Sequence, residues 1–335
     1  MSLDLERLSP WLEANVGLQG PHAATKFSGG QSNPTYLVQG AERSVVLRRK
    51  PPGKLLKSAH AVDREFRVQR ALAGTEVPVA EVYALCEDDG VIGSAFYVME
   101  HLSGRVFDDP RLGDVDKAER RPIINEMGRV LAAIHSVDLE ATGLADYGPS
   151  GNYFRRQIDR WSKQYRASET EVIPAMDQLI AALDRACPED DGQVTLVHGD
   201  YRIDNLMFDA AAPRVRAVLD WELSTLGHPF ADLAAVIMQW QMPPGEQGRG
   251  LRGVDREAQG LVSDEEFVAA YCERMGIDGI ENFGFYVAFC FFRMGAILQG
   301  VAKRALDGNA SDPERGLRLG AFVPLYAEAG REALG

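Results

Sequence analysis

The chain has 335 residues, of which 45% are hydrophobic and 25% charged, the balance of a globular protein with one large or two modest domains. Its formal net charge of −13 disfavours nucleic-acid binding, because phosphate backbones select clustered Lys and Arg. The N-terminal residues lack the pattern of a secretory signal, and no run of 18 uninterrupted apolar residues predicts a membrane span.

The first hundred residues predict short strands around one helix, with a glycine-rich turn between the first two strands. This order predicts a small β-rich lobe over residues 1–102. The predicted elements are a helix at 4–16, strands at 24–27, 35–38 and 44–48, a helix at 59–73, and strands at 77–86 and 95–99.

From about residue 115 the hydrophobic periodicity is mainly helical, which predicts a larger helical lobe over residues 103–335. Residues 241–260 are polar and rich in Gly and Pro, so they predict an exposed loop. The four cysteines and six histidines are scattered, as in a cytoplasmic protein with reduced thiols, and predict neither disulfides nor a His/Cys metal cluster. The predicted elements are helices at 117–136, 151–167, 173–187, 230–240, 263–275 and 282–304, with short apolar runs at 194–197 and 215–219.

The strongest chemical signal in the chain is His198-Gly199-Asp200, followed five residues later by Asn205. A kinase catalytic loop uses the spacing His-x-Asp-x-x-x-x-Asn, because a carboxylate accepts the hydroxyl proton of the acceptor and an amide oxygen binds magnesium. An apolar strand then ends in Asp220, where a kinase has a second metal ligand. The pattern predicts Asp200 as the catalytic base or orienting group, and Asn205 with Asp220 as metal ligands.

The glycine-rich turn is a candidate cover for nucleotide phosphates, because exposed backbone N–H groups bind anions. Glycine pairs are also common in ordinary hairpins, so a purely structural role stays open. The residues assigned to this loop are Ser28, Gly29, Gly30, Ser32 and Asn33.

On the third strand, alternation places Val46 and Arg48 on one face and Arg49 on the other. Arg48 occupies the position where a kinase has the Lys that pairs with the α- and β-phosphates, and Glu65 on the next helix is its natural partner. A solvated strand end and an exposed helical glutamate are the alternative interpretations.

The last strand of the β-rich part leads into the predicted hinge between the lobes. Backbone groups near Glu100 and Leu102 are expected to hydrogen-bond adenine, and Met99 is expected to line its pocket. A plain buried edge strand fits the same pattern.

Taken together, these residues resemble the aminoglycoside phosphotransferase family, which shares the fold of choline kinases and, distantly, of protein kinases. Within it the likeness is closest to the phosphotransferase-like domain fused to some acyl-CoA dehydrogenases. The stretches that carry the resemblance are 27–33, 46–53, 156–161, 196–200 with Asn205, and 218–227.

The resemblance implies an α+β, protein-kinase-like fold with two lobes. It also implies use of ATP and Mg²⁺ and phosphorylation of a small hydroxylated substrate, for this branch a hydroxyacyl-CoA or hydroxy acid. The chain departs from the antibiotic-modifying members by having Arg48 in place of Lys. It ends near Gly335 with no dehydrogenase domain attached, so any coupling to an acyl-CoA dehydrogenase is expected in trans.

Three further residues receive roles by likeness. Asp232 resembles the family's structural aspartate that braces the catalytic loop, although a carboxylate at that place is also a plain helix cap. His198 is expected to be part of the loop's scaffold rather than a proton carrier. Glu222 is a candidate ligand of a second Mg²⁺, by analogy with two-metal phosphoryl transfer.

The predicted helix at 151–167 carries an aromatic stripe with two arginines beside it. These cations favour an anionic acceptor, since arginine binds carboxylates and phosphates through two parallel hydrogen bonds. Core packing is the alternative for the stripe. The candidate substrate residues are Arg156, Arg160 and Trp161, with Arg293 on the predicted C-terminal helix.

Three other functions stay open. A kinase for aminoglycosides, amino alcohols or sugars would use the same chemistry and would need an acidic lip on its substrate cleft. A non-catalytic, nucleotide-binding pseudokinase is disfavoured because Asp200, Asn205 and Asp220 are all present. A protein kinase is disfavoured because the chain has no Ala-Pro-Glu segment and no room for an activation segment.

Overall fold

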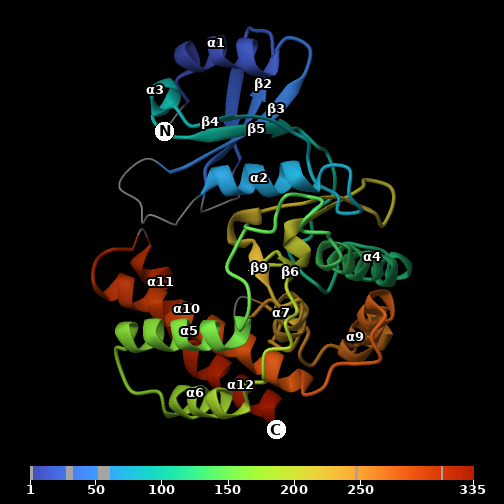
Figure 1. The fold of residues 1–335 in the computed structure, drawn as a ribbon, viewed down its shortest axis with the longest axis vertical. Coiled ribbons are helices and arrows are strands. Elements are labelled where there is room, and N and C mark those ends of the chain that lie inside the picture. Colours follow the sequence, from blue (N-terminus) through green and yellow to red (C-terminus); the bar gives the residue numbers. More distant parts are fainter. Residues whose placement is uncertain (1–2, 28–32, 52–60, 246–247, 311) are drawn as a thin grey trace. The chain divides into compact units, whose positions relative to one another are not determined.

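The computed structural model divides into two units, each formed by several stretches of chain (Figure 1). The first unit comprises Met1–Val106, Asp138–Ala145 and Asp204–Ser224, and the second comprises Phe107–Val137, Asp146–Ile203 and Thr225–Gly335. The residues that the structure describes are 3–27, 33–51, 61–245, 248–310 and 312–335.

An antiparallel five-stranded sheet forms the centre of the first unit, with strand order β1-β2-β3-β5-β4. Its strands are β1 (Ala23–Lys26), β2 (Thr35–Gln39), β3 (Ser44–Arg49), β4 (Val82–Cys86) and β5 (Phe96–Glu100), and its helices are α1 (Leu5–Val16), α2 (Val62–Leu72) and the short α3 (Asp89–Ile92).

Helices α1 and α2 cover opposite faces of this sheet (Figure 1), and the side-chain alternation of the strands shows why. Along β5, Phe96 and Val98 join the apolar cluster that contains Leu8 and Leu12 of α1. The intervening Tyr97 packs on the other side with Val62 of α2 and its neighbours. A strand covered on both faces must be buried along its length, and β3 is buried from its second residue to its last.

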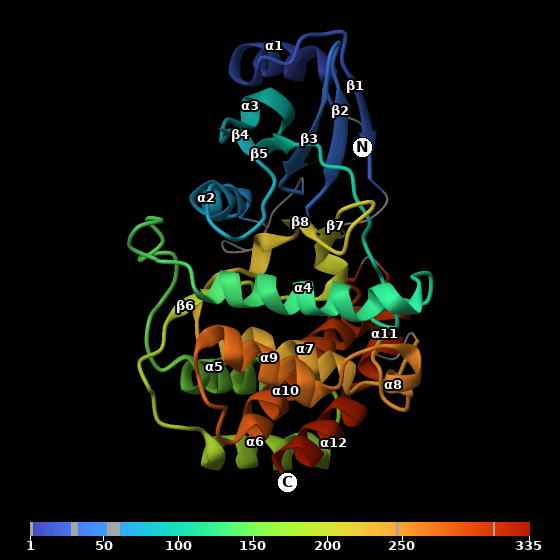
Figure 2. The same cartoon turned by 90° about the vertical axis from the view of Figure 1, so that its right-hand side faces the viewer.

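A two-stranded ribbon, β7 (Leu206–Phe208) and β8 (Val215–Val218), belongs to the first unit although it lies far along the chain (Figure 2). Phe208 exchanges backbone hydrogen bonds with Arg105 at 2.8 Å in each direction. A Cβ at Gly104 would lie 2.3 Å from the Phe208 carbonyl oxygen, so only glycine permits this approach. The contacts therefore group residues 204–224 with the N-terminal sheet.

The second unit is helical around α10, which contacts the helices α5, α6, α7, α11 and α12. By length and composition α10 could cross a membrane, and 72% of its most apolar window is buried inside the protein, as in a core helix. The helices are α4 (Lys117–His135), α5 (Tyr153–Ser168), α6 (Pro174–Ala186), α7 (Phe230–Trp240), α8 (Arg256–Gln259), α9 (Asp264–Met275), α10 (Phe283–Leu306), α11 (Pro313–Gly320) and α12 (Val323–Leu334), and β6 (Thr195–Val197) pairs antiparallel with β9 (Thr225–Gly227).

Most elements lie where the periodicity predicts them, with four differences. The strand predicted at 77–86 begins only at Val82. The segment 241–260 was expected to be exposed, but it contains α8 and buries Met242 and Leu251, because its backbone bonds back to the end of α7. The sequence predicts a single lobe boundary after residue 102. In the structure, 138–145 and 204–224 also group with the N-terminal residues, through non-local contacts that local periodicity does not reveal. The elements that no sequence pattern predicted are α3, β7, β9, α8, α11 and α12.

Candidate active site

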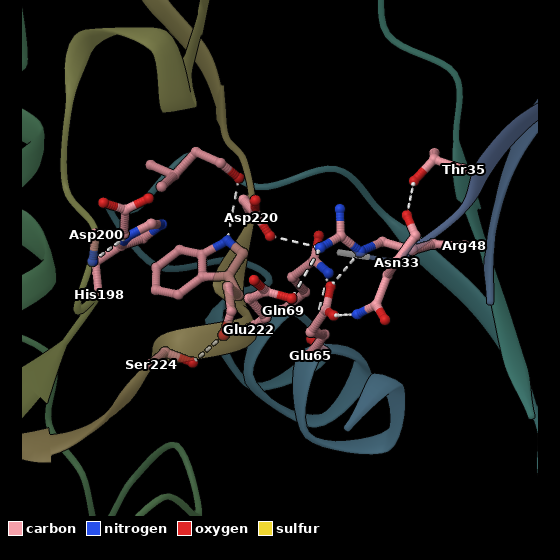
Figure 3. Close-up of polar contacts among 12 residues, drawn as sticks. Asn33, Thr35, Arg48, Glu65, Gln69, His198, Asp200, Asp220, Glu222 and Ser224 are labelled. Atoms are coloured by element: carbon pink, nitrogen blue, oxygen red, sulfur yellow. Dashed lines mark hydrogen bonds and ion pairs between the residues drawn. The ribbon is translucent and has the colours of Figure 1, made fainter. Parts of the chain in front are cut away.

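Arg48 lies at the centre of an ionic network in the first unit (Figure 3). Because Leu47 faces the α1 side of the sheet, its neighbour Arg48 points to the α2 side. Its Nε lies 2.7 Å from Glu65 Oε2, its Nη2 lies 2.5 Å from Asp220 Oδ1, and Glu222 Oε2 is 3.9 Å away. The guanidinium is buried, so the interpretation of Arg48 as a solvated strand end is wrong.

Glu65 is almost fully buried, and neutral donors surround its carboxylate in addition to Arg48. The Asn33 amide donates to Oε1 at 2.6 Å and the Tyr97 hydroxyl donates to Oε2 at 3.1 Å. Gln69 in turn donates to the Tyr97 hydroxyl at 3.0 Å. Burial raises the pKa of Glu65 to about 7, against the opposing influence of Arg48. The network therefore ties α2 to β3. Because Glu65 is buried, its interpretation as an exposed helical residue is wrong.

Asp220 and Asn205 lie at the same end of the β7–β8 ribbon. The ribbon pairs Leu206 with Val218, and the Leu219 N–H donates to the Asn205 carbonyl at 2.8 Å. Asp220 itself has a left-handed backbone with φ of 62°, which is uncommon outside glycine and turns its side chain away from the strand direction.

The turn after Asp220 is held by its own hydrogen bonds (Figure 3). The Trp221 indole donates to the Val218 carbonyl at 3.0 Å, and the Ser224 hydroxyl donates to the Trp221 carbonyl at 2.6 Å. These bonds leave the Asp220 and Glu222 carboxylates partly exposed, at 32% and 19% of their side-chain surface. The site thus keeps two carboxylates accessible on a rigid turn.

The donor set of this turn suits Mg²⁺, which prefers hard oxygen ligands and keeps several waters beside nucleotide phosphates. Asp220, Glu222 and the Asn205 amide offer such oxygens. Among the described residues there is no group of three or more His, Cys, Asp or Glu side chains that could hold a metal by itself. Two carboxylates and an amide oxygen fit an ion that takes its remaining ligands from water and nucleotide phosphates.

In the second unit, the loop that carries Asp200 is held by buried Asp232 at the start of α7. The carboxylate of Asp232 accepts the backbone N–H groups of His198 at 2.6 Å and Gly199 at 2.9 Å. The His135 Nε2 lies 3.5 Å from the same carboxylate. Although burial acts to raise it, the pKa of Asp232 is lowered, because His135 and His198 stabilise the ionised form.

Two more contacts fix the peptide group that joins Gly199 to Asp200. The Asp200 N–H donates to His198 Nδ1 at 3.3 Å, and Arg293 of α10 donates to the Gly199 carbonyl at 3.0 Å. Gly199 has φ of 83°, which a side chain would strain. His198 is fully buried and thus lies under the loop rather than at its surface.

The Asp200 side chain is one-third exposed and faces a cavity of about 170 Å³ within the second unit. Its Oδ1 lies 3.2 Å from Nε of Arg202. Of the predicted substrate residues, Arg293 lines this cavity, and Arg202 and Arg249 are lining residues that the sequence pattern did not single out. Arg202 could have been noticed from its place two residues after Asp200, whereas Arg249 carries no local signal.

The structure does not bring the other predicted substrate residues to this cavity. Arg156 donates to the carbonyls of Gly151 and Pro149 at 2.8 and 3.0 Å, so it closes the loop before α5. The Arg160 guanidinium lies 5.3 Å from the centroid of the Trp161 ring. Their predicted role in substrate binding therefore has no support from the geometry of the second unit.

The remaining nucleotide contacts are partly defined. The Glu100 N–H already donates to the Glu81 carbonyl at 2.8 Å, so an adenine contact at this residue would need its carbonyl group. Met99 packs with the apolar cluster around Tyr97, and Leu102 lies in the segment after β5. Ser28, Gly29, Gly30 and Ser32 lie outside the described residues, and the buried Asn33 side chain contacts Glu65.

Curated relatives share sequence with almost the whole chain. Acyl-CoA dehydrogenase family member 10 of Mus musculus is 48% identical over 314 residues, covering 93% of this chain and 29% of its own length. Acyl-CoA dehydrogenase family member 11 of Homo sapiens is 42% identical over 306 residues, covering 91% and 39%. The chain thus spans less than half the length of these relatives.

Solved structures share its fold. A protein of Ralstonia eutropha, provisionally described as an aminoglycoside phosphotransferase, has 48% identity and a TM-score of 0.91, with 99% of this chain and 98% of the other covered. The aminoglycoside phosphotransferase APH(4)-Ia, in complex with AMP-PNP and hygromycin B, has 18% identity and a TM-score of 0.65, with 97% and 98% covered. The phosphotransferase enzyme family matches residues 23–273. With this match and the 48% identity to a full-length solved relative, the chain belongs to the phosphotransferase enzyme family and has its α+β, protein-kinase-like fold.

Proposed function

We propose that the chain transfers the γ-phosphoryl group of Mg·ATP to the hydroxyl of a hydroxy acid or a hydroxyacyl-CoA. The observation that carries the acceptor class is the cavity beside Asp200, to which three arginines contribute. A pocket lined by guanidinium groups favours an anionic acceptor over a polycationic aminoglycoside.

The first unit would bind the nucleotide. Arg48, held by Glu65, would contact the phosphates, as the third-strand lysine does in kinases. Asn205 and Asp220, with Glu222 beside them, would hold the magnesium ion. Bound there, Mg²⁺ would neutralise charge on the transferring phosphoryl group.

Asp200 would orient the acceptor hydroxyl and accept its proton as the oxygen attacks the γ-phosphorus. The new bond joins the acceptor oxygen to phosphorus, the bond between the γ-phosphorus and the bridging oxygen breaks, and ADP leaves. Asp232 and Arg293 would act through the backbone, because they hold the loop at the two residues that precede Asp200. His198 would support the loop without exchanging protons.

The acyl-CoA part of this proposal draws on the relatives' names, which describe proteins more than twice as long as this chain. A dehydrogenase acting in trans would then supply the substrate or use the product. The retention of Asp200, Asn205 and Asp220 supports catalysis rather than nucleotide binding alone.

An acceptor screen tests the proposal. The purified chain is incubated with Mg²⁺ and ATP labelled in the γ-phosphate, together with hydroxy acids, hydroxyacyl-CoAs, sugars, amino alcohols and hygromycin B. We expect transfer to a hydroxy acid or its thioester. Transfer to hygromycin B or an amino alcohol alone would contradict the acceptor class, and no transfer to any compound would contradict the kinase activity.

A further inference from the structure

The cavity beside Asp200 contains a feature that the proposed function does not explain, namely that the catalytic carboxylate is already engaged. Arg202 follows Asp200 by two residues, and its Nε lies 3.2 Å from Asp200 Oδ1. The Arg202 side chain is one-quarter exposed and lines the same cavity. Arg202 therefore occupies one of the two carboxylate oxygens that could accept the proton of an acceptor hydroxyl.

Arg249 reaches the cavity from a segment that is tightly held. Its backbone has φ of 49°, an uncommon conformation for a side chain of this size. The next residue, Gly250, could not carry a Cβ, which would lie 2.0 Å from the Met242 carbonyl oxygen and 2.4 Å from that of Gln239. The backbone strain at Arg249 is maintained by this close packing, which fixes where the residue enters the cavity wall.

Arg202, Arg249 and Tyr326 all line this cavity. Burial raises the pKa of the Tyr326 phenol, and the positive charges of Arg202 and Arg249 both act to lower it. An anion that enters beside Tyr326 would meet two cations, and the charge-assisted hydrogen bonds they form are stronger than neutral ones.

Besides Gln239 and Tyr201, much of the remaining wall is apolar. This apolar part is formed by Ala235, Met238, Met294, Leu298, Leu319 and Phe322. A cavity of about 150 Å³ accommodates a benzene-sized molecule, so a space of about 170 Å³ suits a short carbon chain. The cavity as a whole suits a small molecule with an apolar body and one anionic group.

We propose that Arg202 is the specificity-determining residue of the acceptor site: it exchanges its ion pair with Asp200 for one with an anionic group of the acceptor. This inference rests on the proposed function. An anionic acceptor then releases the Asp200 carboxylate for its own hydroxyl, whereas a neutral acceptor leaves Arg202 paired with the catalytic residue. A ligand shifts such an equilibrium only by its differential affinity for the two arrangements, and the anion supplies that difference.

The anionic group could be the carboxylate of a free hydroxy acid or a phosphate of coenzyme A. The test compares four derivatives of 3-, 4- and 5-hydroxypentanoate: the free acid, the CoA thioester, the pantetheine thioester, which lacks the phosphates, and the primary amide. For each, kcat and KM are measured with the wild type, Arg202→Gln, Arg202→Lys and Arg249→Gln. Arg331→Gln, an exposed arginine of α12, is the matched control.

With the wild type we expect kcat/KM to be about 10- to 100-fold higher for an anionic derivative than for its neutral counterpart. Arg202→Gln should remove this preference, Arg202→Lys and Arg249→Gln should reduce it, and Arg331→Gln should keep it. If Arg202→Gln lowers kcat/KM for the free acid but not for its amide, the carboxylate is the recognised group. If Arg202→Gln removes the higher kcat/KM of the CoA thioester over the pantetheine thioester, the phosphates are the recognised group.

If Arg202→Gln lowers kcat/KM equally for charged and neutral derivatives, the inference is overturned, but the proposed kinase activity is not. A wild type that does not distinguish them would also overturn the inference. A wild type that phosphorylates none of the four derivatives would contradict the proposed acceptor itself. Thermal unfolding of each variant separates lost folding from lost recognition.

Discussion

Arg48 and Asp220 lie 172 residues apart in the sequence, and their side chains form an ion pair with Nη2 2.5 Å from Oδ1. The same guanidinium contacts Glu65, so one arginine joins a strand of the sheet, the helix α2 and the turn that carries the proposed metal ligands. In the proposed reaction Arg48 must share its donors between these carboxylates and the nucleotide phosphates. The pair thus links the architecture of the first unit to nucleotide binding.

We expect Arg48→Met to lower the free energy of unfolding by about 3–5 kcal/mol, because it leaves Glu65 buried without its ionic partner. Arg48→Lys should lose less stability, since lysine keeps the charge, although it cannot contact two carboxylates with the fork of a guanidinium. Urea unfolding measures the difference, with the exposed Arg43→Met as control. The double variant Arg48→Met/Glu65→Leu should recover most of the loss, and failure to recover it would contradict the ionic explanation.

Asp220→Asn should weaken binding of AMP-PNP in the presence of Mg²⁺ by 10-fold or more, since even indirect partners of a metal ligand cost about 10- to 100-fold. Asparagine tolerates the left-handed backbone that Asp220 adopts, so the turn should survive the substitution. Calorimetric titrations of AMP-PNP in Mg²⁺ and in EDTA separate nucleotide binding through the metal from nucleotide binding without it. The same loss under both conditions would show that Asp220 does not act through a metal, and Asp89→Asn on the surface is the control.

The sequence predicted most of the helices and the sheet strands, because amphipathic periodicity is a local property. The short strands β7 and β9 escaped prediction, since three residues such as Leu206–Phe208 are too few to show a period. The grouping of 204–224 with the N-terminal sheet also escaped, because it depends on contacts such as that of Val218 with Pro78. Non-local pairing leaves no trace in local composition.

The candidate site shows the same limit. The spacing from His198 to Asn205 predicts a kinase loop. Strand alternation correctly separates Arg48 from Arg49, which instead donates to Ser94 at 3.0 Å. Arg249 could not be foreseen, since only the folding of its segment onto α7 brings it to the cavity that contains Asp200. A cationic side chain becomes a candidate for anion binding only when its surroundings are known.

Asp200→Asn should lower kcat by about 100- to 10,000-fold with the best acceptor, because the amide cannot accept the hydroxyl proton. Binding of AMP-PNP should stay close to that of the wild type, since Asp200 belongs to the acceptor cavity. Steady-state kinetics measures the fall in kcat, and calorimetry measures AMP-PNP binding. The exposed Asp159→Asn is the control. Undiminished turnover by Asp200→Asn would contradict its role as base.

Asp232→Asn should destabilise the second unit by about 2–5 kcal/mol at neutral pH, because one of the two buried N–H donors of His198 and Gly199 loses its acceptor. The pKa of Asp232 is lowered in the folded protein, so its contribution is present above the unfolded-state pKa. As the pH falls through the folded-state pKa, the advantage of the wild type over Asp232→Asn should disappear. Urea unfolding at several pH values measures this, and a constant difference would contradict the ionic role.

Glu65 should give the opposite pH dependence, because burial raises its pKa in the folded protein to about 7 from an ordinary value of 4.5. Below the ordinary pKa the carboxyl is protonated in both states, so it adds no pH dependence to the stability. Between the two values the folded state binds the extra proton, so the wild type loses stability as the pH rises, by at most about 1.4 kcal/mol for each pH unit. Glu65→Gln cannot titrate, so its free energy of unfolding relative to the wild type should rise across this window and level off above it. Exposed Glu42→Gln is the control, and parallel pH profiles for the wild type and Glu65→Gln would show that Glu65 does not titrate there.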